Sequence, residues 1–197
     1  MLKHRTYRHM RIIAGKAKGY NIQVPQGEVR PTQDRVREAL FNILNPLLPG
    51  ARVLDLFCGS GSVGLEALSR GAASARMVDA SHQSCAMARK NLEKSKLIGG
   101  SVVQSDCLQF VRRDFGQYDI IFADPPYAKA IGDRDMIAEL MTDRLHELLA
   151  EGGYFIAEAQ EGYGVGDSHS REFPGWKLVD ARYYGKNVIL FYQVESI

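Results

Sequence analysis

The sequence predicts an α/β fold in which a mostly parallel, doubly wound sheet is preceded by a small β-hairpin. From residue 52 onward, short apolar runs alternate with amphipathic segments of helical spacing. These runs do not alternate between apolar and polar residues, as expected of strands that are buried on both faces. At the end of the chain, two strand-like segments follow each other without a helix between them. They predict an antiparallel hairpin at one edge of the sheet.

The N-terminal part is expected to contain a β-hairpin followed by a helix. Residues 10–30 hold one or two short strand-like runs that are interrupted by glycines and prolines. A helix is predicted after Pro31, because apolar residues recur there at helical spacing, with Thr32 as its N-cap and an Asn-Pro pair at its end. We therefore expect two parts, namely a basic extension with the hairpin at residues 1–30 and the main domain at residues 31–197.

The main domain should alternate strands and helices. In chain order, the expected elements are a strand at 52–57, a helix ending at Arg70, a strand at 75–79, a helix at 81–96, a strand at 101–104, an amphipathic segment at 107–115, a strand at 118–124, a helix at 133–149, a strand at 154–160, and hairpin strands at 176–184 and 187–194. Ligands of such sheets bind beyond the carboxyl ends of the strands, so the residues that end each run are the candidates for chemistry.

Composition excludes several classes of protein. A chain of 197 residues with 45% apolar and 24% charged side chains can bury a core, which excludes a disordered or collagen-like chain. No apolar run approaches the roughly 20 residues of a membrane-spanning helix, so no membrane partner is expected. The three cysteines lie far apart, so neither a disulfide framework nor a metal site is expected. A reducing cytoplasm fits this cysteine usage, and the small size favours a monomer.

Positive charge is concentrated at the start of the chain. The first 40 residues hold nine Lys or Arg and three acids, whereas the remaining 157 carry 16 basic and 20 acidic side chains. A cationic segment favours a polyanionic partner, because phosphate contacts release condensed counterions. A solvated arm without a partner explains the charge alone equally well. For a nucleic-acid partner, the candidate contacts are Arg11, Lys16, Lys18, Arg30 and Arg35, together with Arg37.

A glycine-rich turn follows the first strand of the main domain. Gly59, Gly61 and Gly64 form a GxGxxG pattern between a strand and a helix, the context that a cofactor-binding turn requires. Nicotinamide and flavin enzymes share this pattern, but Asp55 at the mouth of the turn would repel their pyrophosphate. Its carboxylate could accept hydrogen bonds from the ammonium group of S-adenosylmethionine, which has no phosphate. The structural alternative is a tight turn in which Asp55 accepts only backbone amides.

Two further acids follow the next strands. Asp79 closes the strand at 75–79, where a carboxylate can accept both ribose hydroxyls of a nucleoside cofactor. Its alternative role is that of a charge at a helix N-terminus. Asp106 could accept from an adenine amino group, with the Cys107 N–H opposite the ring, although an Asp in this position is also a common helix cap.

The segment Asp124-Pro125-Pro126-Tyr127 directly follows an apolar strand and is the predicted catalytic group. The two prolines remove backbone donors and stiffen the turn. The Asp124 carboxylate and the Pro125 carbonyl could each accept one N–H of an exocyclic amine on a nucleobase, which would aim the nitrogen at the methyl donor. Tyr127 offers an aromatic face for stacking an extruded base. A proline-stiffened loop with a capping Asp is the structural alternative.

Together these segments resemble the RsmD family, bacterial guanine-N2 methyltransferases that act on small-subunit (16S) ribosomal RNA. The resemblance runs from about Met10 to Tyr192 and rests on DLFCGSG, ADPPY, RIIAGKAKGYNIQVP and RPTQDRVREALFNIL. It implies a class I S-adenosylmethionine-dependent methyltransferase, Rossmann-like, with a seven-stranded sheet. Its partner would be ribosomal RNA, either naked or in an assembled 30S subunit or precursor.

The same resemblance implies a set of cofactor contacts. Two positions depart from the family pattern, since Cys58 stands where Ala is common and Asp79 stands where Glu is more usual. Asp is shorter by one methylene, which affects the ribose contact. The implied contacts are Thr32, Asp55, Phe57, Gly59, Gly61, Asp79 and Asp106.

Three other functions are compatible with parts of the pattern. A DNA adenine-N6 methyltransferase would share the chemistry, but the chain has no insertion that could form a separate DNA-recognition domain. A nicotinamide-binding Rossmann oxidoreductase would explain the glycine turn and Asp79, but it would give no role to Asp124-Pro125-Pro126-Tyr127. A catalytically silent RNA-binding protein would not need that segment either.

Overall fold

The computed structural model describes residues 8–24, 31–126, 134–160 and 172–195. In chain order, its elements are β1 (Arg8–Arg11), β2 (Asn21–Val24), α1 (Pro31–Leu44), β3 (Arg52–Leu56), α2 (Ser62–Ser69), β4 (Ser74–Asp79), α3 (His82–Ser95), β5 (Gly100–Gln104), α4 (Cys107–Arg113), β6 (Tyr118–Ala123), α5 (Met136–Thr142), α6 (Leu145–Leu148), β7 (Leu149–Gln160), β8 (Trp176–Tyr184) and β9 (Asn187–Val194).

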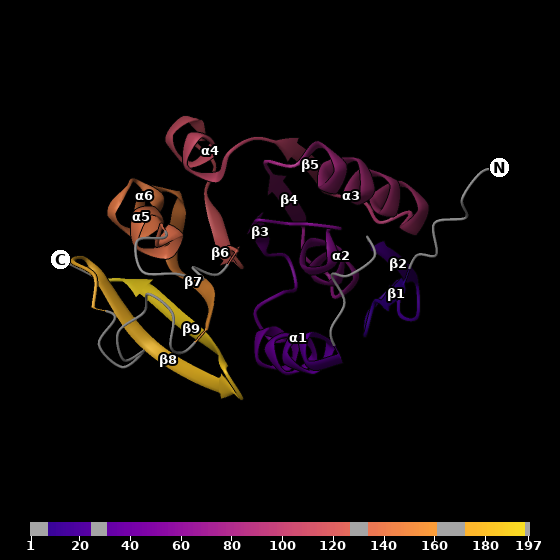
Figure 1. Ribbon diagram of the computed structural model, residues 1–197, viewed down its shortest axis with the longest axis horizontal. Coiled ribbons are helices and arrows are strands. Elements are labelled where there is room, and N and C mark those ends of the chain that lie inside the picture. Colours follow the sequence, from indigo (N-terminus) through magenta and orange to yellow (C-terminus); the bar gives the residue numbers. More distant parts are fainter. Residues whose placement is uncertain (1–7, 25–30, 127–133, 161–171, 196–197) are drawn as a thin grey trace.

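The main sheet has seven strands in the order β5-β4-β3-β6-β7-β9-β8, and β1 and β2 form a separate antiparallel pair (Figure 1). Strands β3 to β7 pair in parallel, whereas β9 is antiparallel to both β7 and β8. The predicted fold class, a mostly parallel sheet that ends in an antiparallel hairpin, is therefore confirmed. The C-terminal hairpin lies at one edge with β9 inserted beside β7, so β8 is the edge strand.

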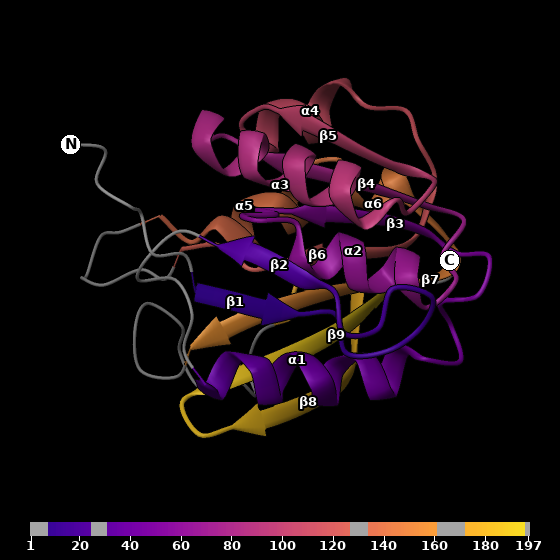
Figure 2. The same ribbon diagram turned by 90° about the vertical axis from the view of Figure 1, so that its right-hand side faces the viewer.

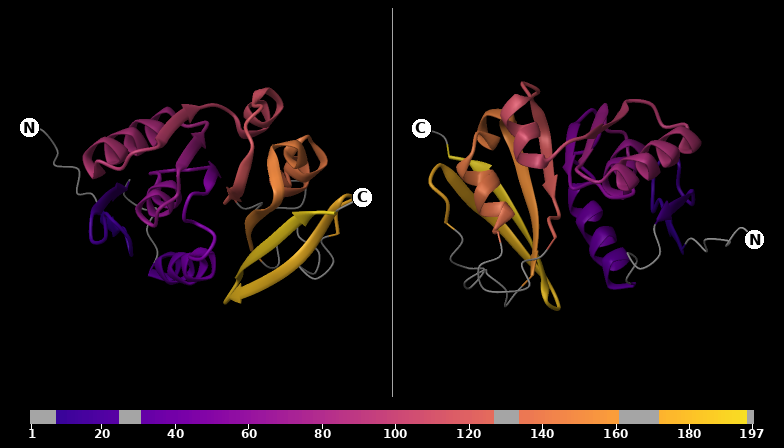
Figure 3. Two further views of the ribbon diagram at one scale, coloured as in Figure 1. Left: turned by 180° about the vertical axis from the view of Figure 1, so that it is seen from behind. Right: turned by 45° about the horizontal axis from the view of Figure 1, so that its top comes forward.

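Helices cover both faces of this sheet (Figures 1 and 3). On one face, α1 and α2 enclose a core that includes Phe41, Leu68 and Phe122. On the other, α4, α5 and α6 pack on a core that includes Leu54, Ile121 and Phe155. Adjacent residues such as Ile121 and Phe122 enter opposite cores, which explains why the strand sequences are apolar throughout.

Three expected boundaries differ from the structure. The helix expected at 133–149 is two short helices, α5 and α6, because Asp143 leaves the helical conformation and accepts from the Arg144 N–H and the Arg112 side chain. Strand β7 begins at Leu149, where it pairs with Tyr118 before a register shift, and not at residue 154. Helix α1 already includes Pro31, so Thr32 is not its N-cap; proline is favoured at the first helical position.

The β1–β2 hairpin is packed against α2 and α3 (Figure 2). Its apolar side chains, including Ile12 and Ile22, contact Leu65 of α2. Buried polar groups add direct bonds, since both oxygens of Glu66 accept hairpin amides, from Ile13 at 2.7 Å and from Ala14 at 3.1 Å. The hairpin is thus attached to the helices on one face of the main sheet, both by a shared apolar core and by hydrogen bonds from its backbone amides to the Glu66 carboxylate.

Two more residues hold the hairpin at its ends. At the turn, the Ser69 carbonyl accepts from the Lys16 N–H at 2.7 Å. At β2, the Asn91 side chain accepts from the Gln23 N–H at 3.0 Å and donates to the Gln23 carbonyl at 2.9 Å. The same amide donates to the Ser60 carbonyl at 3.0 Å, so Asn91 connects the hairpin to the glycine-rich turn.

Replacing Gly15 by alanine should weaken this attachment. Gly15 has a φ of +83°, and a Cβ built there would lie 1.9 Å from the Ser69 carbonyl oxygen. We expect the substitution to lower the free energy of unfolding by about 2–4 kcal/mol, because a clash with backbone adds to the strain of positive φ. Urea-unfolding curves measure the change.

Gly19→Ala is the matched control for this substitution. Its φ is +84°, but a Cβ there would meet nothing within 4 Å. It should therefore show only the backbone cost of about 1–2 kcal/mol. Equal losses for the two variants would mean that the close approach to Ser69 contributes nothing.

Within the described ranges, no helix combines the length and the apolar character that crossing a membrane requires. The same part of the chain contains no group of three or more His, Cys, Asp or Glu side chains arranged to hold a metal ion.

Candidate active site

A cavity of about 240 Å³ opens at the carboxyl ends of the central strands. Its walls come from four places, namely the hairpin, α1, the turn after β3, and the ends of β6 and β7. The acids on its lining are Asp55, Asp124 and Glu158, and Arg37 of α1 is the basic residue among them. The predicted site residues that it brings together are Asp55, Phe57, Gly59 and Asp124.

The turn between β3 and α2 is shaped by positive φ angles. Phe57, Gly59 and Gly61 have φ values of 69°, 52° and 84°. A Cβ at Gly59 would meet nothing within 4 Å, which leaves the backbone open to a ligand. At Gly64, in contrast, a Cβ would lie 2.5 Å from the Met77 side chain, so this glycine allows α2 to pack on β4. The glycines of the GxGxxG pattern therefore have different roles, Gly59 in the turn and Gly64 in the first turn of α2.

Asp55 is buried below this turn, and 1% of its surface is exposed. One of its oxygens accepts from the Gly64 N–H at 3.2 Å. Burial raises the pKa of Asp55 from its ordinary 3.8 to about 8; the Gly64 hydrogen bond opposes the shift and the nearby Asp79 adds to it. A buried carboxylate of this kind would be stabilised by a cationic ligand group.

In the ligand-free protein, Asp55 should make stability fall as the pH rises. Because its pKa is about 8 in the folded chain and 3.8 in water, the folded state binds more protons between these values. The contribution of this group is full below about pH 4 and decreases by up to about 1.4 kcal/mol per pH unit toward pH 8. Asp55→Asn, which keeps an oxygen for the Gly64 amide, should remove this slope.

Urea unfolding of the wild-type protein and of Asp55→Asn at about pH 6 and about pH 8 measures this difference. The variant should gain stability relative to the wild type at the higher pH. Identical pH dependences of the two proteins would show that Asp55 is already ionised in the folded state at neutral pH.

The acids at the ends of β4 and β5 do not line this cavity. Asp79 accepts from the Gly59 N–H at 2.9 Å and from the Ser81 N–H at 2.8 Å, so it connects the end of β4 to the glycine turn. Asp106 caps α4 by accepting from the Gln109 N–H at 3.0 Å. Cys107 is buried, and burial raises the pKa of its thiol to about 12. Both acids lie at strand ends as expected. Each also has the structural role given above as its alternative, since Asp79 lies beside the start of α3 and Asp106 caps α4.

Asp124 and Glu158 lie side by side at the ends of two neighbouring parallel strands. Phe122 pairs with Ile156 and Ala123 with Ala157, so one further step of the same register places Asp124 beside Glu158. Both side chains line the cavity. Burial raises the pKa of Asp124 well above its usual range, and the charges of Glu158 and Asp55 add to the effect. Pro125 is buried and Pro126 is exposed, whereas Tyr127 lies outside the described residues.

The predicted RNA contacts fall in different places. Arg11, Lys16 and Lys18 are exposed on the hairpin, but the turn with the two lysines binds Ser69 at the end of α2 that is remote from the cavity. Figure 2 shows this turn at the opposite end of the hairpin from the tip of β2. Arg30 and the side chains of Arg35 and Thr32 lie outside the described part of the chain.

Arg37 does not lie on the surface with the other basic side chains that were predicted to contact RNA. Only 7% of it is exposed, and its Nη2 donates to the Arg11 carbonyl at 2.8 Å. It lines the cavity instead of presenting its charge on the surface. Helical spacing alone does not distinguish a surface arginine from one that faces a polar cavity.

Sequence reasoning also missed Glu158. It lies near the carboxyl end of β7, and the rule that chemistry lies at the carboxyl ends of strands could have found it. Its partner Asn187 begins β9, and the side-chain amide of Asn187 donates to Glu158 Oε1 at 2.8 Å. This contact depends on the pairing of β7 with β9, which no local pattern contains.

The strand order, the glycine turn after β3 and the acids at the strand ends define the class of protein. The chain is a class I methyltransferase, a class that takes S-adenosylmethionine as its methyl donor. A solved structure that shares this fold, with a TM-score of 0.70 and 20% identity, is complexed with SAH; the match covers 95% of this chain and 56% of that one. At that identity the likeness concerns the fold alone.

Comparison with protein families gives a finer result. The chain belongs to the family described as Conserved hypothetical protein 95, which matches residues 10–193. It is 40% identical over 151 residues to ribosomal RNA small subunit methyltransferase D of Escherichia coli (strain K12), with 76% of this chain and 71% of the relative covered. The predicted resemblance to the RsmD family is thereby confirmed.

A solved structure supports the same result. It is described as "Putative methyltransferase yhhF from Escherichia coli", and it matches with a TM-score of 0.81 and 32% identity. The match covers 96% of this chain and 100% of that chain.

Proposed function

We propose that the chain transfers a methyl group from S-adenosylmethionine to the exocyclic N2 amine of one guanine in small-subunit ribosomal RNA. The observation that carries the proposal is the position of Asp124, at the end of β6, in the same cavity as the glycine turn. The name of the Escherichia coli relative supports small-subunit ribosomal RNA as the substrate. Residues 31–197 would form the catalytic domain, and residues 1–30 would contact RNA.

The residues of the cavity fit S-adenosylmethionine. Gly59 leaves space at the turn, and buried Asp55 would be stabilised by the ammonium group of the methionine part. When bound, the cofactor supplies an electrophilic methyl group on its sulfonium. Asp79 would accept from the ribose, and Asp106 with the Cys107 N–H would hold the adenine. The remaining proposed contacts are Thr32, Phe57 and Gly61.

The amine of the target base would be held by the turn after β6. The Asp124 carboxylate accepts one N–H and the Pro125 carbonyl accepts the other, which leaves the nitrogen lone pair directed at the methyl donor. The Asp124 charge also stabilises the positive charge that develops on the nitrogen. Transfer would leave S-adenosylhomocysteine, and loss of one proton from the nitrogen would give the neutral methylated amine. Tyr127 would stack on the extruded base.

The RNA would follow the hairpin away from the cavity. Arg11 lies beside the cavity residue Arg37, and Lys16 and Lys18 lie at the far end of α2. Since α2 spans eight residues, the two ends are separated by roughly 12 Å. A single RNA segment that contacts both ends would therefore extend over two or more phosphates.

Replacing Lys16 and Lys18 by alanine should weaken RNA binding and reduce its salt dependence. Each lost phosphate contact should lower the slope of log K against log salt by about 1. Filter binding of small-subunit ribosomal RNA at several salt concentrations measures the slope. Lys177→Ala, an exposed lysine on β8, is the control. An unchanged slope for the double variant would exclude the hairpin turn from the RNA interface.

Mass spectrometry of the methylated product tests the proposed function. The purified chain is incubated with S-adenosylmethionine and small-subunit ribosomal RNA, naked or as assembled subunits, and the RNA is digested to nucleosides. N2-methylguanosine is the expected product. Methylation of adenine N6, of DNA, or of no nucleoside would contradict the proposal. Calorimetry should detect binding of S-adenosylhomocysteine, and tight binding of NADH alone would favour an oxidoreductase.

A further inference from the structure

The Asp124 carboxylate and the Pro125 carbonyl form the proposed amine clamp. The cavity contains another carboxylate beside them, that of Glu158. The register of β6 and β7 places Glu158 next to Asp124. In parallel sheets neighbouring strands lie about 4.8 Å apart, so two side chains on the same face at this register can contact adjacent atoms of one ligand. Both residues line the cavity, and Glu158 is 8% exposed.

The Glu158 carboxylate is held in place by the neighbouring strand. Asn187 lies on β9, opposite Gln160 of β7, and its side-chain amide donates to Glu158 Oε1 at 2.8 Å. A carboxylate has two oxygens and about four lone-pair sites, so it can accept a further donor while this bond is kept. The bond also favours the acceptor role of Glu158, because its partner is a donor.

We propose that Glu158 accepts the N1–H of the target guanine and thereby selects guanine over other purines. The inference rests on the proposed function and adds a specificity-determining residue to it. The Watson–Crick edge of guanine carries two adjacent donors, the N1–H and the N2 amine. Two neighbouring carboxylates match this pair, with Glu158 on N1 and Asp124 on N2.

Other purines do not match this arrangement. Adenine has a lone pair at N1, which would face the Glu158 carboxylate and repel it. A site built to accept a substrate N–H rejects analogues without it strongly, because the buried acceptor is left without a donor. Glu158 would therefore discriminate against adenine even where the amine clamp could hold an exocyclic amine.

Because charged side chains surround the amine clamp, the dependence of activity on pH provides a second test of the role of Glu158. The charged groups that face Asp124 are Asp55 of β3, Glu158 of β7 and Arg37 of α1. Glu158 is the charged neighbour with the largest effect in raising the pKa of Asp124. Glu158→Gln should therefore lower that pKa and move the acidic limb of the activity profile to lower pH, a change that a merely structural residue would not produce.

The decisive substrate is RNA with 2-aminopurine at the methylated position. This base keeps the 2-amine but has a lone pair in place of the N1–H. The position is first mapped by mass spectrometry, and the base is then placed in synthetic ribosomal RNA, naked or reconstituted into subunits. For the wild-type protein, we expect kcat/KM to be at least about 100-fold lower than with guanine.

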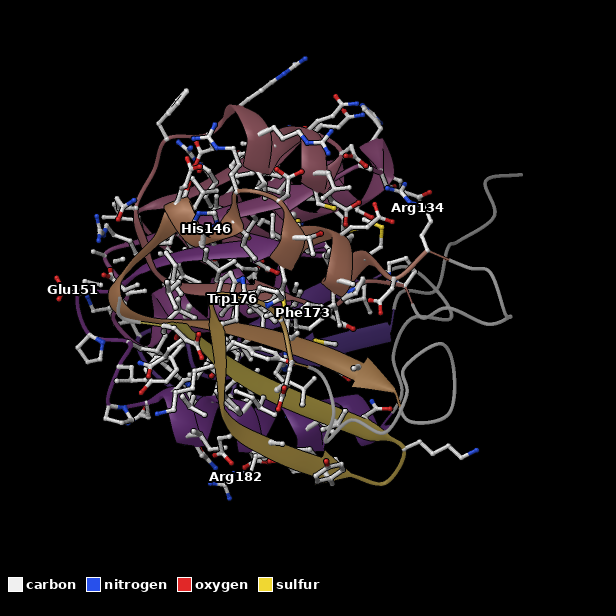
Figure 4. The ribbon with its side chains drawn as sticks, turned by 90° about the vertical axis from the view of Figure 1, so that its left-hand side faces the viewer. Arg134, His146, Glu151, Phe173, Trp176 and Arg182 are labelled. Atoms are coloured by element: carbon white, nitrogen blue, oxygen red, sulfur yellow. The ribbon has the colours of Figure 1, made fainter. Side chains whose placement is uncertain are left out.

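Glu158→Gln should restore methylation of the RNA with 2-aminopurine, because the amide N–H of the glutamine can donate to N1. We expect the ratio of kcat/KM for guanine to that for 2-aminopurine to fall by about tenfold or more relative to the wild type. Glu151→Gln is the control, since Glu151 is exposed near the start of β7, and Figure 4 shows it on the side opposite the carboxyl end of this strand. It should leave the ratio unchanged.

Failure of this inference can be told apart from failure of the proposed function. If the wild-type protein does not methylate guanine N2, the proposed function fails. If it methylates guanine and 2-aminopurine equally well, only the role of Glu158 is overturned, and this result needs no variant. An unchanged ratio in a Glu158→Gln protein that still binds S-adenosylhomocysteine overturns it as well.

Discussion

Asp124→Ala should lower kcat for RNA methylation by about 100- to 1,000-fold, the usual effect of removing one preorganised group that stabilises developing charge. The affinity for S-adenosylhomocysteine should change little, because the proposed cofactor contacts lie on α1, on β3 and its glycine turn, and at the ends of β4 and β5, and none of them lies on β6. Single-turnover kinetics with small-subunit ribosomal RNA measure the first quantity, and calorimetry measures the second.

The stability of this variant separates a catalytic effect from unfolding. Burial, Glu158 and Asp55 raise the pKa of Asp124 well above its usual range. A group with a raised folded-state pKa contributes stability at low pH that is lost as the pH rises toward that pKa. Removing it should therefore leave the protein at least as stable near neutral pH.

Two comparisons complete this experiment. Asp180→Ala removes a partly exposed acid that pairs with Arg182 on β8, remote from the cavity lining, and it should leave kcat unchanged. Asp124→Asn keeps one acceptor oxygen but not the charge, so its loss should be smaller than that of Asp124→Ala. Full activity of Asp124→Ala would remove the amine clamp from the mechanism.

Most of the fold could be predicted because its signals are local. An unbroken apolar run such as that of β6 indicates a strand buried on both faces, and the structure places Ile121 and Phe122 in opposite cores. The helix expected at 133–149 was wrong for a reason that is not local, since the Arg112 side chain, which donates to Asp143, belongs to α4. Sequence spacing therefore predicted which strands and helices are present better than it predicted the residues at which they begin and end.

The same distinction applies to the site. Asp55 lies near the end of β3, Gly59 lies in the turn after it, and Asp124 directly follows β6, so the order of the strands was sufficient to bring them to one cavity. The neighbours that modify them come from elsewhere in the chain. Glu158 depends on its register with β6, and Arg37 turns toward the cavity from α1, where it donates to the hairpin. Neither the register nor the packing of the hairpin can be obtained from residue spacing.

The attachment of the hairpin gives the second large prediction, because Glu66→Ala should lower the free energy of unfolding by about 3–5 kcal/mol. Glu66 is fully buried, and besides the two hairpin amides it accepts from Arg70 Nε at 2.7 Å. Arg70 also donates to the Phe41 carbonyl and to Asn45, so it would stay buried without its carboxylate. Urea unfolding measures the loss.

Hydrogen exchange shows where the loss occurs. In Glu66→Ala the amides of Ile13 and Ala14 lose their acceptor, so their exchange should approach that of exposed amides before the sheet unfolds. Glu147→Ala, which breaks the exposed pair with Arg144, should cost less than about 1 kcal/mol and leave these amides protected. If both variants lost the same stability, the buried carboxylate would not be what fastens the hairpin to α2. Some other contact would then have to hold the hairpin, and the proposed RNA contacts on it, in a fixed position relative to the cavity.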